Sequence, residues 1–597
     1  MFDGRIYRVA FVPLLFVLVV VGFSLAGRPP ALHSTLAPDA FDGPRAFAEL
    51  QALVKRFPVR RPGGAGDEEL AAYVAQALRG AGSGGGPEGA FQVSAHRFRA
   101  QTVDGARTLT TVIAKRPGST GLAPIALVAH RDAVGRGAAA ELSGTAALLE
   151  LARVFSQSET RRTIVIVSTS GGSGGDAGAA DFAGGAGHAL DAAIVLGDLA
   201  GAGAHMPFVL PFSDTQISAP ESLRSTLEGA IGQEVGVAAG TPSVATQLAH
   251  LAFPSATGEE APLDDAGTPA VLLQVGGERG PSSGERVSES RLSNFGRAAL
   301  SATYALDEGP DLTGPSAARL LLGRKTLPAW AIRLLALALL LPPLIVCVDA
   351  LARLRRRKEP LGRWVAWTLT GSLPFLVAGL FAILLGGLGI VAAPLAQLPA
   401  ASLAADGSAA GALASTLLVL ALGLLAWPGL MRRLALPPRP CADGAGLVAL
   451  LVALMVALVA WIFDPFACLL LIPALHLWLL AADPRPRGRP LALAAIAASV
   501  VPVVLLLLVY ARELGLGPVG LAESAVLALA GGQVGLLTAL LWSLALGCLL
   551  AMLARALAPD PVDLAGGRDL VENISTRGPL SYAGPGSLGG TESALRR

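Results

Sequence analysis

Seven apolar stretches in the second half of the chain are long enough to cross a lipid bilayer, and they constrain the fold more than any other feature. A membrane-spanning helix needs about 20 such residues. The stretches are 329–351, 363–391, 409–431, 445–463, 465–482, 490–511 and 533–556. A shorter apolar stretch, 517–531, is expected to lie at the membrane surface or to re-enter the bilayer. Residues 328–557 are therefore predicted to form an all-α polytopic transmembrane bundle of about seven helices.

The composition supports a membrane protein and argues against one that binds nucleic acid. Hydrophobic residues make up 53% of the sequence and charged residues only 15%, which is too apolar for one soluble globular domain. The net charge is +2, so the chain has no strong positive field to attract nucleic acid. The lipid bilayer is the partner that this composition predicts.

A further apolar run, Val9 to Leu25, follows Arg5 and Arg8 near the N-terminus. It has two interpretations, a membrane anchor or a cleaved signal peptide, because Ser24-Leu25-Ala26 resembles a cleavage site. The run is longer than the apolar core of a typical signal peptide, which has about 7–15 residues. We therefore favour an uncleaved anchor within residues 1–27.

Basic residues cluster after alternate spans and predict the orientation of the chain. Positive loops mark the cytoplasmic side of a membrane. The clusters comprise Arg353, Arg355, Arg356, Arg357 and Lys358, then Arg432, Arg433 and Arg439, then Arg485, Arg487 and Arg489. The intervening loop 396–408 has no Lys or Arg. Counting the anchor as the first span places these clusters on the side of Arg5, so both termini are predicted to be cytoplasmic and residues 28–327 extracytoplasmic.

The sequence supports three further predictions, which concern the origin of the chain, its C-terminal tail and a polar residue within a membrane span. The abundance of Ala, Gly, Leu and Arg favours a bacterial chain in the inner membrane. The tail 558–597 is rich in Gly, Pro and Ser and is predicted to be disordered. His476 is the ionisable residue that we expect inside the membrane, where such groups are often functional, whereas Asp464 and Glu523 are expected in outer loops.

Strand and helix patterns alternate in the region before the membrane spans. Predicted strands cover 91–97, 109–114, 125–129, 163–168, 193–196 and 270–275, and predicted helices cover 44–57, 67–78 with Asp67 as N-cap, 143–155, 177–187, 219–231 and 289–306. This alternation favours an open, mainly parallel α/β sheet, in which ligands bind at the carboxyl ends of the strands. His130, Ser173 and Asp198 each follow a strand closely. This region has no cysteine, which excludes disulfides and cysteine-based metal sites.

The order of several short motifs resembles the M28 family of di-zinc aminopeptidases. An apolar strand ends in His130-Arg-Asp132, and Ser143-Gly144 then opens a helix. Asp198-Leu-Ala-Gly201 follows a later strand, and Ala266-Gly-Thr-Pro-Ala270 opens the last one. The resemblance covers about residues 44–306. It implies a mostly parallel zinc-aminopeptidase-like sheet sandwiched by helices for the domain at residues 28–327.

The resemblance also implies where metal ligands should lie. The family uses five ligands around two zinc ions, one of them a bridging carboxylate, and a separate Glu as general base. His130 and Asp198 match two ligand positions, and Asp132 matches the residue that orients His130. The bridging position falls near Ala139, two residues from Glu141.

The remaining positions of the family pattern are changed. The Glu-Glu pair aligns with Gly172 and Ser173, and Glu260 stands where the family has its late His. Zinc is therefore expected in at most one site, held by His130, Asp198 and either Glu141 or Glu260. Each of these residues also has a purely structural interpretation, as a loop hydrogen-bonding group, a turn cap or a solvated charge.

The Gly-rich loop at residues 171–175 also allows a second interpretation, as part of a serine hydrolase site. Gly171-Gly-Ser173-Gly-Gly175 fits a nucleophile elbow between a strand and a helix, and Asp198 and His250 follow in acid-then-His order. The chain has 71 Gly, so this match is weak evidence for a serine hydrolase. The glycines can equally fill space left by the missing carboxylates.

These observations allow two functions. Whether the chain is an enzyme stays open, and we favour a protein without catalytic activity. The first is a pseudoenzyme that binds or presents a peptide or lipid-linked substrate, or scaffolds a membrane protein complex. Its architecture is similar to the Gaa-type subunit of GPI transamidase. The second is an active membrane-tethered zinc metallopeptidase that hydrolyses peptides outside the cytoplasm as an aminopeptidase, with Glu141 or Ser173 as candidate catalytic residues. Measurements of bound metal and of substrate turnover distinguish these two functions.

Overall fold

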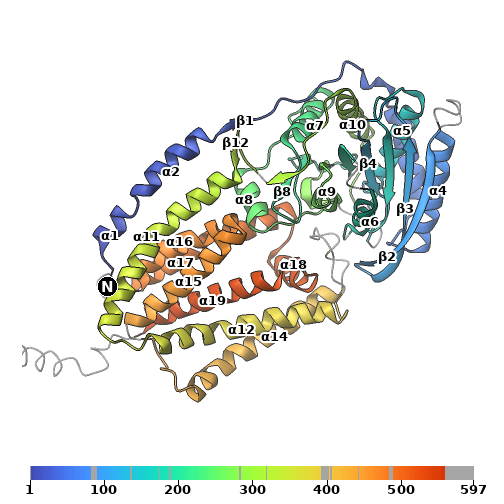
Figure 1. Ribbon diagram of the computed structural model, residues 1–597. Helices are drawn as coiled ribbons and strands as arrows, with labels where there is room; N and C mark the ends of the chain where they lie inside the picture. The colour runs from blue at the N-terminus through green and yellow to red at the C-terminus, as the bar shows by residue number, and fades with distance from the viewer. Residues whose placement is uncertain are drawn as a thin grey trace, which may run out of the picture.

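A computed structural model of the chain places an α/β region beside a long bundle of apolar helices (Figure 1). The structure describes residues 2–81, 90–134, 138–173, 175–186, 190–281, 284–317, 319–391, 403, 407–440, 443–482 and 488–558. The predicted disordered tail beyond residue 558 lies outside this part of the chain, as do Arg485 and Arg487.

A seven-stranded sheet forms the centre of the α/β region, in the order β2-β3-β5-β4-β6-β9-β7. Its four central strands are parallel, and β2, β3 and β7 are antiparallel at the two sides. The strands are β2 (Gln92–Thr102), β3 (Gly105–Arg116), β4 (Ile125–His130), β5 (Ile164–Thr169), β6 (Ala192–Leu196), β7 (Val209–Leu210) and β9 (Ala270–Leu273). The predicted mostly parallel α/β sheet with helices on both faces is thus confirmed.

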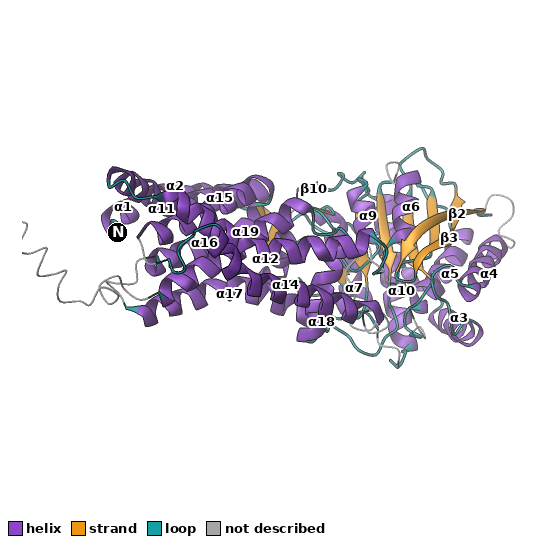
Figure 2. Ribbon diagram, turned by 90° about the horizontal axis from the view of Figure 1, so that it is seen from below, coloured by secondary structure: helices purple, strands orange, loops and turns teal. Residues whose placement is uncertain are grey.

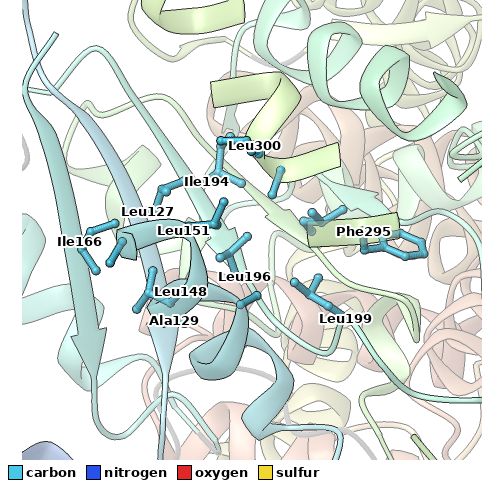
Figure 3. Close-up of a cluster of buried hydrophobic side chains, with 14 of the residues drawn as sticks. Leu127, Ala129, Leu148, Leu151, Ile166, Ile194, Leu196, Leu199, Phe295 and Leu300 are labelled. Carbon is cyan, nitrogen blue, oxygen red and sulfur yellow. The ribbon is translucent and has the colours of Figure 1, made fainter. Parts of the chain in front are cut away.

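Helices cover both faces of this sheet because its central strands are apolar on both sides. Alternate side chains of a strand point to opposite faces, so Leu127 and Ile166 join one core while Val128 and Val167 join the other. Figure 3 shows the first core, in which Leu148 and Leu151 of α5 and Phe295 and Leu300 of α10 pack on the strands. This face is covered by α3 (Gly43–Arg56), α4 (Ala65–Ala81), α5 (Leu142–Gln157), α7 (Glu221–Glu234) and α10 (Glu289–Glu308). The other face is covered by α6 (Ala177–Ala186) and α9 (Glu260–Asp265).

Helix α4 begins earlier than predicted, and this changes the role of Asp67. The helix starts at Ala65, so Asp67 lies in its first turn and is not its N-cap. Its buried carboxylate lies 2.9 Å from Nε of Arg131 and also accepts from the amide of Gly63. The prediction failed because a buried ionic partner, which the local sequence does not reveal, fixes this side chain.

The helical region contains seven helices that are long and apolar enough to cross a membrane, among the described residues. They are Gly4–Phe23 (α1, Gly4–Val9, followed by α2, Val12–Phe23), α11 (Ala329–Arg356), α12 (Leu361–Gly387), α14 (Gly407–Arg433), Gly444–Phe463 within α15 (Asp443–Phe463), α17 (Arg489–Glu513) and α19 (Leu536–Leu557). Two apolar helices are shorter, α16 (Pro465–Ala481) and α18 (Pro518–Ala530). The chain is an integral membrane protein, and the span predicted at 465–482 corresponds to the 17-residue α16, which Asp464 caps.

His476 has hydrogen-bond partners for both ring nitrogens inside this bundle. Its Nε2 lies 2.9 Å from the carbonyl oxygen of Leu339, which can only accept. The hydroxyl of Tyr7 lies 2.7 Å from its Nδ1 and donates to it. His476 therefore ties the N-terminal segment to the bundle, which is a structural role for the residue singled out within the membrane.

Short elements connect the two regions. A three-stranded sheet joins the residues after α2 to the start of α11, in the order β1-β12-β11. Helix α8 lies against α16 and α17, so the α/β region rests on the membrane bundle (Figures 1 and 2). The short elements outside the central sheet and its covering helices are β1 (Ala26–Gly27), η1 (Pro38–Ala40), β8 (Ile217–Ser218), α8 (Val244–Ala252), η5 (Gly277–Arg279), β10 (Ser316–Ala317), β11 (Arg319–Leu322) and β12 (Lys325–Pro328).

Candidate functional site

The Gly-rich loop after β5 wraps around the carboxylate of Asp132. The amides of Gly171 and Gly172 donate to Oδ1 at 2.8 and 3.1 Å. The amide and hydroxyl of Ser173 donate to Oδ2 at 3.2 and 2.8 Å. Gly171 has a φ of +88°, which lets the loop turn and aim consecutive amides at one anion. The hydrogen bonds of Asp132 thus hold the loop, while its charge opposes the effect of burial, which lowers the pKa of neighbouring His130.

The proposed nucleophile elbow does not bring its three side chains together. The Ser173 hydroxyl donates to Asp132 and has no hydrogen bond to a histidine among the described residues. Nε2 of His250 lies instead beside two glutamates, Glu278 and Glu513. Because Ser173 lacks an adjacent base, the loop has the sequence of an elbow without its chemistry.

Asp198 lies at the end of β6, where its carboxylate closes a turn. Its Oδ1 accepts from the amides of Ala200 and Gly201 at 2.9 and 2.7 Å, and from the hydroxyl of Ser143 at 3.3 Å. Its Oδ2 is buried and has no hydrogen-bond partner. Burial raises the pKa of Asp198 to about 6, although the two amides oppose this shift. Oδ1 is therefore engaged in hydrogen bonds that stabilise the turn, whereas Oδ2 is available to a ligand.

A buried arginine supplies the positive charge at this edge of the sheet. Arg60 is only 1% exposed, and it donates to the carbonyl of Ala138 at 2.9 Å and to Oε2 of Glu141 at 3.1 Å. Burial raises the pKa of Glu141 to about 8 even though Arg60 opposes the shift. The same burial lowers the pKa of Arg60, but a guanidinium stays charged in proteins, so its contact with Glu141 is a charge-assisted hydrogen bond. Arg60 was not predicted as a site residue, because it lies 81 residues before Glu141 in the sequence.

The space beside His130 is closed at the position where the family has its glutamate pair. A Cβ added to Gly172 would lie 2.4 Å from Cβ of His130 and 3.0 Å from Cδ of Glu259. Any side chain at residue 172 would therefore displace one of these two groups. Glu259 is buried, neither of its oxygens has a hydrogen-bond partner, and burial raises its pKa to about 8.

The sequence motif predicts that the neighbouring Glu260 stands at the position of the last metal ligand of the family. In the structure Glu259 is the glutamate that reaches toward His130, whereas Oε2 of Glu260 lies against Gly258. Burial raises the pKa of Glu260 well above its usual value, and the charges of Glu278 and Asp264 add to this shift. The Glu-Glu dipeptide carries a signal for the position, but both side chains are buried and only the backbone path decides which of them lies toward His130.

His130, Asp132, Glu141, Asp198 and Glu259 together are called the strand-edge cluster below. Within the described residues, one group of three or more His, Cys, Asp and Glu side chains has its ligand atoms within 4.8 Å of one another, and it is a different group. The predicted set of His130, Asp198, Glu141 and Glu260 does not converge to this degree. Because a catalytic zinc needs three protein ligands, this arrangement does not fit a zinc ion.

One family model matches part of the α/β region. Residues 111–250 match the model of Peptidase family M28. The chain therefore carries an M28 peptidase-like domain. No curated protein matches the chain.

Several solved structures are similar to part of the chain. A zinc aminopeptidase from Bacillus subtilis is 12% identical, with 46% of this chain and 98% of that one covered and a TM-score of 0.36. An Acidobacteriales bacterium glutaminyl cyclase is 15% identical over 47% of this chain and 99% of that one, with a TM-score of 0.36. A Porphyromonas gingivalis glutaminyl cyclase is 19% identical over 44% and 98%, with a TM-score of 0.32.

Proposed function

We propose that this protein is a membrane-embedded pseudoenzyme whose M28 peptidase-like domain binds or presents a substrate, or scaffolds a membrane complex. The single observation that carries the proposal is the pairing of two of the four strand-edge carboxylates with groups of the protein itself. Asp132 is held by the Gly-rich loop and Glu141 by Arg60, so both have found partners other than a metal. A scaffold or binding domain of this kind takes a peptide or a lipid-linked substrate.

The distribution of basic residues supports a domain that works outside the cytoplasm. Helix α11 starts next to the α/β region and ends, at Arg355 and Arg356, beside the N-terminal helix α1 (Figure 1). Helix α14 likewise ends in Arg432 and Arg433. Because positive residues mark the cytoplasmic side, we assign both termini to the cytoplasm and residues 28–327 to the extracytoplasmic side of a bacterial inner membrane. Residues 1–27 serve as an uncleaved anchor, 328–557 form the membrane domain and 558–597 a cytoplasmic tail.

An active membrane-tethered zinc aminopeptidase is the second candidate. It is favoured by the buried, unpartnered oxygens of Asp198 and Glu259, since such oxygens are costly unless something binds them. Glu259 lies close to His130, so a rearrangement of this edge would give a histidine and two carboxylates. This candidate requires the strand-edge cluster to move on metal binding.

Turnover by the full chain in detergent distinguishes the two candidates. Wild type and a His130→Ala, Asp198→Asn double variant are compared on a panel of aminoacyl chromogenic substrates and on N-terminal glutaminyl peptides. A pseudoenzyme gives the same background rate for both proteins. His96→Ala is the matched control, because His96 is an exposed histidine on β2 away from the cluster. Turnover that the double variant abolishes and His96→Ala retains would overturn the proposal in favour of the aminopeptidase.

A further inference from the structure

A second buried polar cluster lies where the α/β region meets the membrane bundle. It consists of His250 on α8, Glu278 on η5 and Glu513 at the end of α17, and we call it the interface cluster. Nε2 of His250 lies 3.0 Å from Oε1 of Glu278 and 3.1 Å from Oε2 of Glu513. This is the one group in the described part of the chain whose ligand atoms all lie within 4.8 Å of one another.

The ring of His250 is fixed with its Nε2 directed at the two carboxylates. Its Nδ1 lies 2.8 Å from the carbonyl oxygen of Ser255, which can only accept, so Nδ1 carries a proton. Phe212 stacks on the ring with centroids 3.7 Å apart and planes 6° from parallel. In the neutral form, a proton on Nδ1 leaves the lone pair on Nε2. Metal-binding histidines are commonly held this way, with the second nitrogen donating to a carbonyl or carboxylate.

The charge of the cluster is unbalanced without a cation. Two carboxylates face one imidazole, which leaves a net charge of −1 with His250 protonated and −2 with it neutral. Glu278 is only 6% exposed, and its oxygens have no hydrogen-bond partner beyond the contact of Oε1 with Nε2 of His250. The nearby Arg279 donates to the carbonyl of Arg512 at 3.0 Å. A divalent cation bound to neutral His250 and both carboxylates would bring the net charge to zero, and buried charges are otherwise expensive.

The spacing of the ligand atoms suits zinc. Two ligands bound at about 2.0–2.1 Å to a tetrahedral zinc lie about 3.3 Å apart, close to both distances from Nε2. A cavity of about 420 Å³ borders Glu278 and Glu513 and leaves room for water at a fourth position. The hydroxyl of Tyr510, which lies 3.4 Å from Nδ1 of His250, lies 2.7 Å from the Phe253 carbonyl oxygen and donates to it.

We propose that His250, Glu278 and Glu513 form a three-ligand Zn²⁺ site that joins the extramembrane domain to membrane helix α17. The donor set, one imidazole and two carboxylates with an open fourth position toward the cavity, is of the kind that zinc takes. This site is separate from the strand-edge cluster and does not depend on whether that cluster is catalytic. A bound ion would clamp α8 and η5 onto α17 and fix the domain on the bundle.

Zinc binding by the full chain tests the proposal. Protein purified in detergent is stripped with a chelator, titrated with Zn²⁺ against a competing dye, and checked by elemental analysis for one equivalent of zinc. Wild type should bind it, and His250→Asn and Glu513→Gln should each weaken binding by at least about 10- to 100-fold, the loss typical even of outer-shell changes. Tyr510→Phe is the matched control, because it alters a neighbour of His250 that is not a ligand and should retain the metal.

The thermal midpoint provides a second readout that does not require the variants to bind metal. Excess zinc should raise the midpoint of wild type and of Tyr510→Phe but not that of Glu513→Gln, whose side chain is partly exposed and whose loss should leave the fold intact. A metal-free wild type would overturn the proposal even if His250→Asn fails to fold. Zinc that is lost in His130→Ala, Asp198→Asn but kept in His250→Asn would also overturn it, and would count instead against the pseudoenzyme.

Discussion

The two buried polar clusters of this protein differ in where their counter-charges come from. In the strand-edge cluster, loop amides surround Asp132 and the guanidinium of Arg60 lies against Glu141. In the interface cluster, one imidazole faces two carboxylates, and Glu278 contacts no polar group other than Nε2 of His250 among the described residues. The first cluster lies where the resemblance to the M28 family predicts metal ligands, whereas the second draws on α17 of the membrane domain. Resemblance to a metalloenzyme therefore does not tell where in the chain a metal would bind.

Removing Arg60 should lower the stability of the folded protein more than the other changes proposed below. Arg60→Met leaves the carbonyl of Ala138 and the carboxyl of Glu141 buried without their donor, and each buried group that loses its hydrogen-bond partner costs about 1–3 kcal/mol. Arg61→Met is the matched control in the same loop, because Arg61 pairs with Asp104 but is 41% exposed, and exposed pairs contribute about 0–1 kcal/mol. Chemical unfolding of the full chain in detergent, followed by limited proteolysis of the domain, measures both.

The same variant can test whether the strand-edge cluster is also a metal site. If the strand-edge cluster is a metal site that Arg60 merely occupies, Arg60→Met should gain zinc affinity and recover stability when zinc is added. We expect neither, since the ligand atoms do not converge. Recovery of stability by zinc in Arg60→Met but not in Arg60→Met, His130→Ala would show that the two clusters are of the same kind.

Glu259 should give a smaller effect that depends on pH. Its pKa is raised from 4.5 to about 8 by burial, so the folded state keeps a proton that the unfolded state releases between these values. Stability is therefore lost as pH rises from about 4.5 to 8, by up to about 1.4 kcal/mol per pH unit. Glu259→Gln removes this loss but buries an amide at a cost of about 1–3 kcal/mol. We expect a net gain of about 2 kcal/mol at pH 8 and no gain at pH 4.5.

Unfolding midpoints of wild type and Glu259→Gln between pH 4.5 and 8.5 measure this dependence. Glu49→Gln is the control, because Glu49 lies on α3 at the surface and hydrogen-bonds only to Tyr73 among the described residues. A variant that is less stable than wild type at pH 8 would mean that Glu259 is ionised and bound to a cation. The strand-edge cluster would then resemble the interface cluster in needing one.

Much of the α/β fold could be predicted because its signals are local. The run from Ile125 to Ala129 is apolar throughout and is followed by the polar His130, as expected of a central parallel strand, and the structure has β4 there. The membrane helices could be located for the same reason, since length and hydropathy within one segment decide them. Helix α16 differs because it is only 17 residues long, between its N-cap Asp464 and its C-cap Ala482.

The candidate sites were less predictable because their contacts join distant parts of the chain. Arg60 and Glu141 are 81 residues apart, and His250 and Glu513 are 263 apart. His250 was considered only as a member of a serine-hydrolase triad, since Glu278 and Glu513 belong to no motif. The choice between Glu259 and Glu260 depends on a single residue of backbone register, which a sequence alone does not fix.

Ser173→Ala should give the smallest effect and test what the Gly-rich loop does. The variant removes one hydrogen bond to Asp132 but leaves three backbone amides around the carboxylate, so stability should fall by about 1 kcal/mol. Any esterase background should be unchanged, since Ser173 has no base beside it. Ser170→Ala, a change at the other end of the loop where the hydroxyl donates to Asp67, is the comparison for stability. Loss of hydrolysis in Ser173→Ala alone would make the loop a nucleophile elbow and the strand-edge cluster an active site.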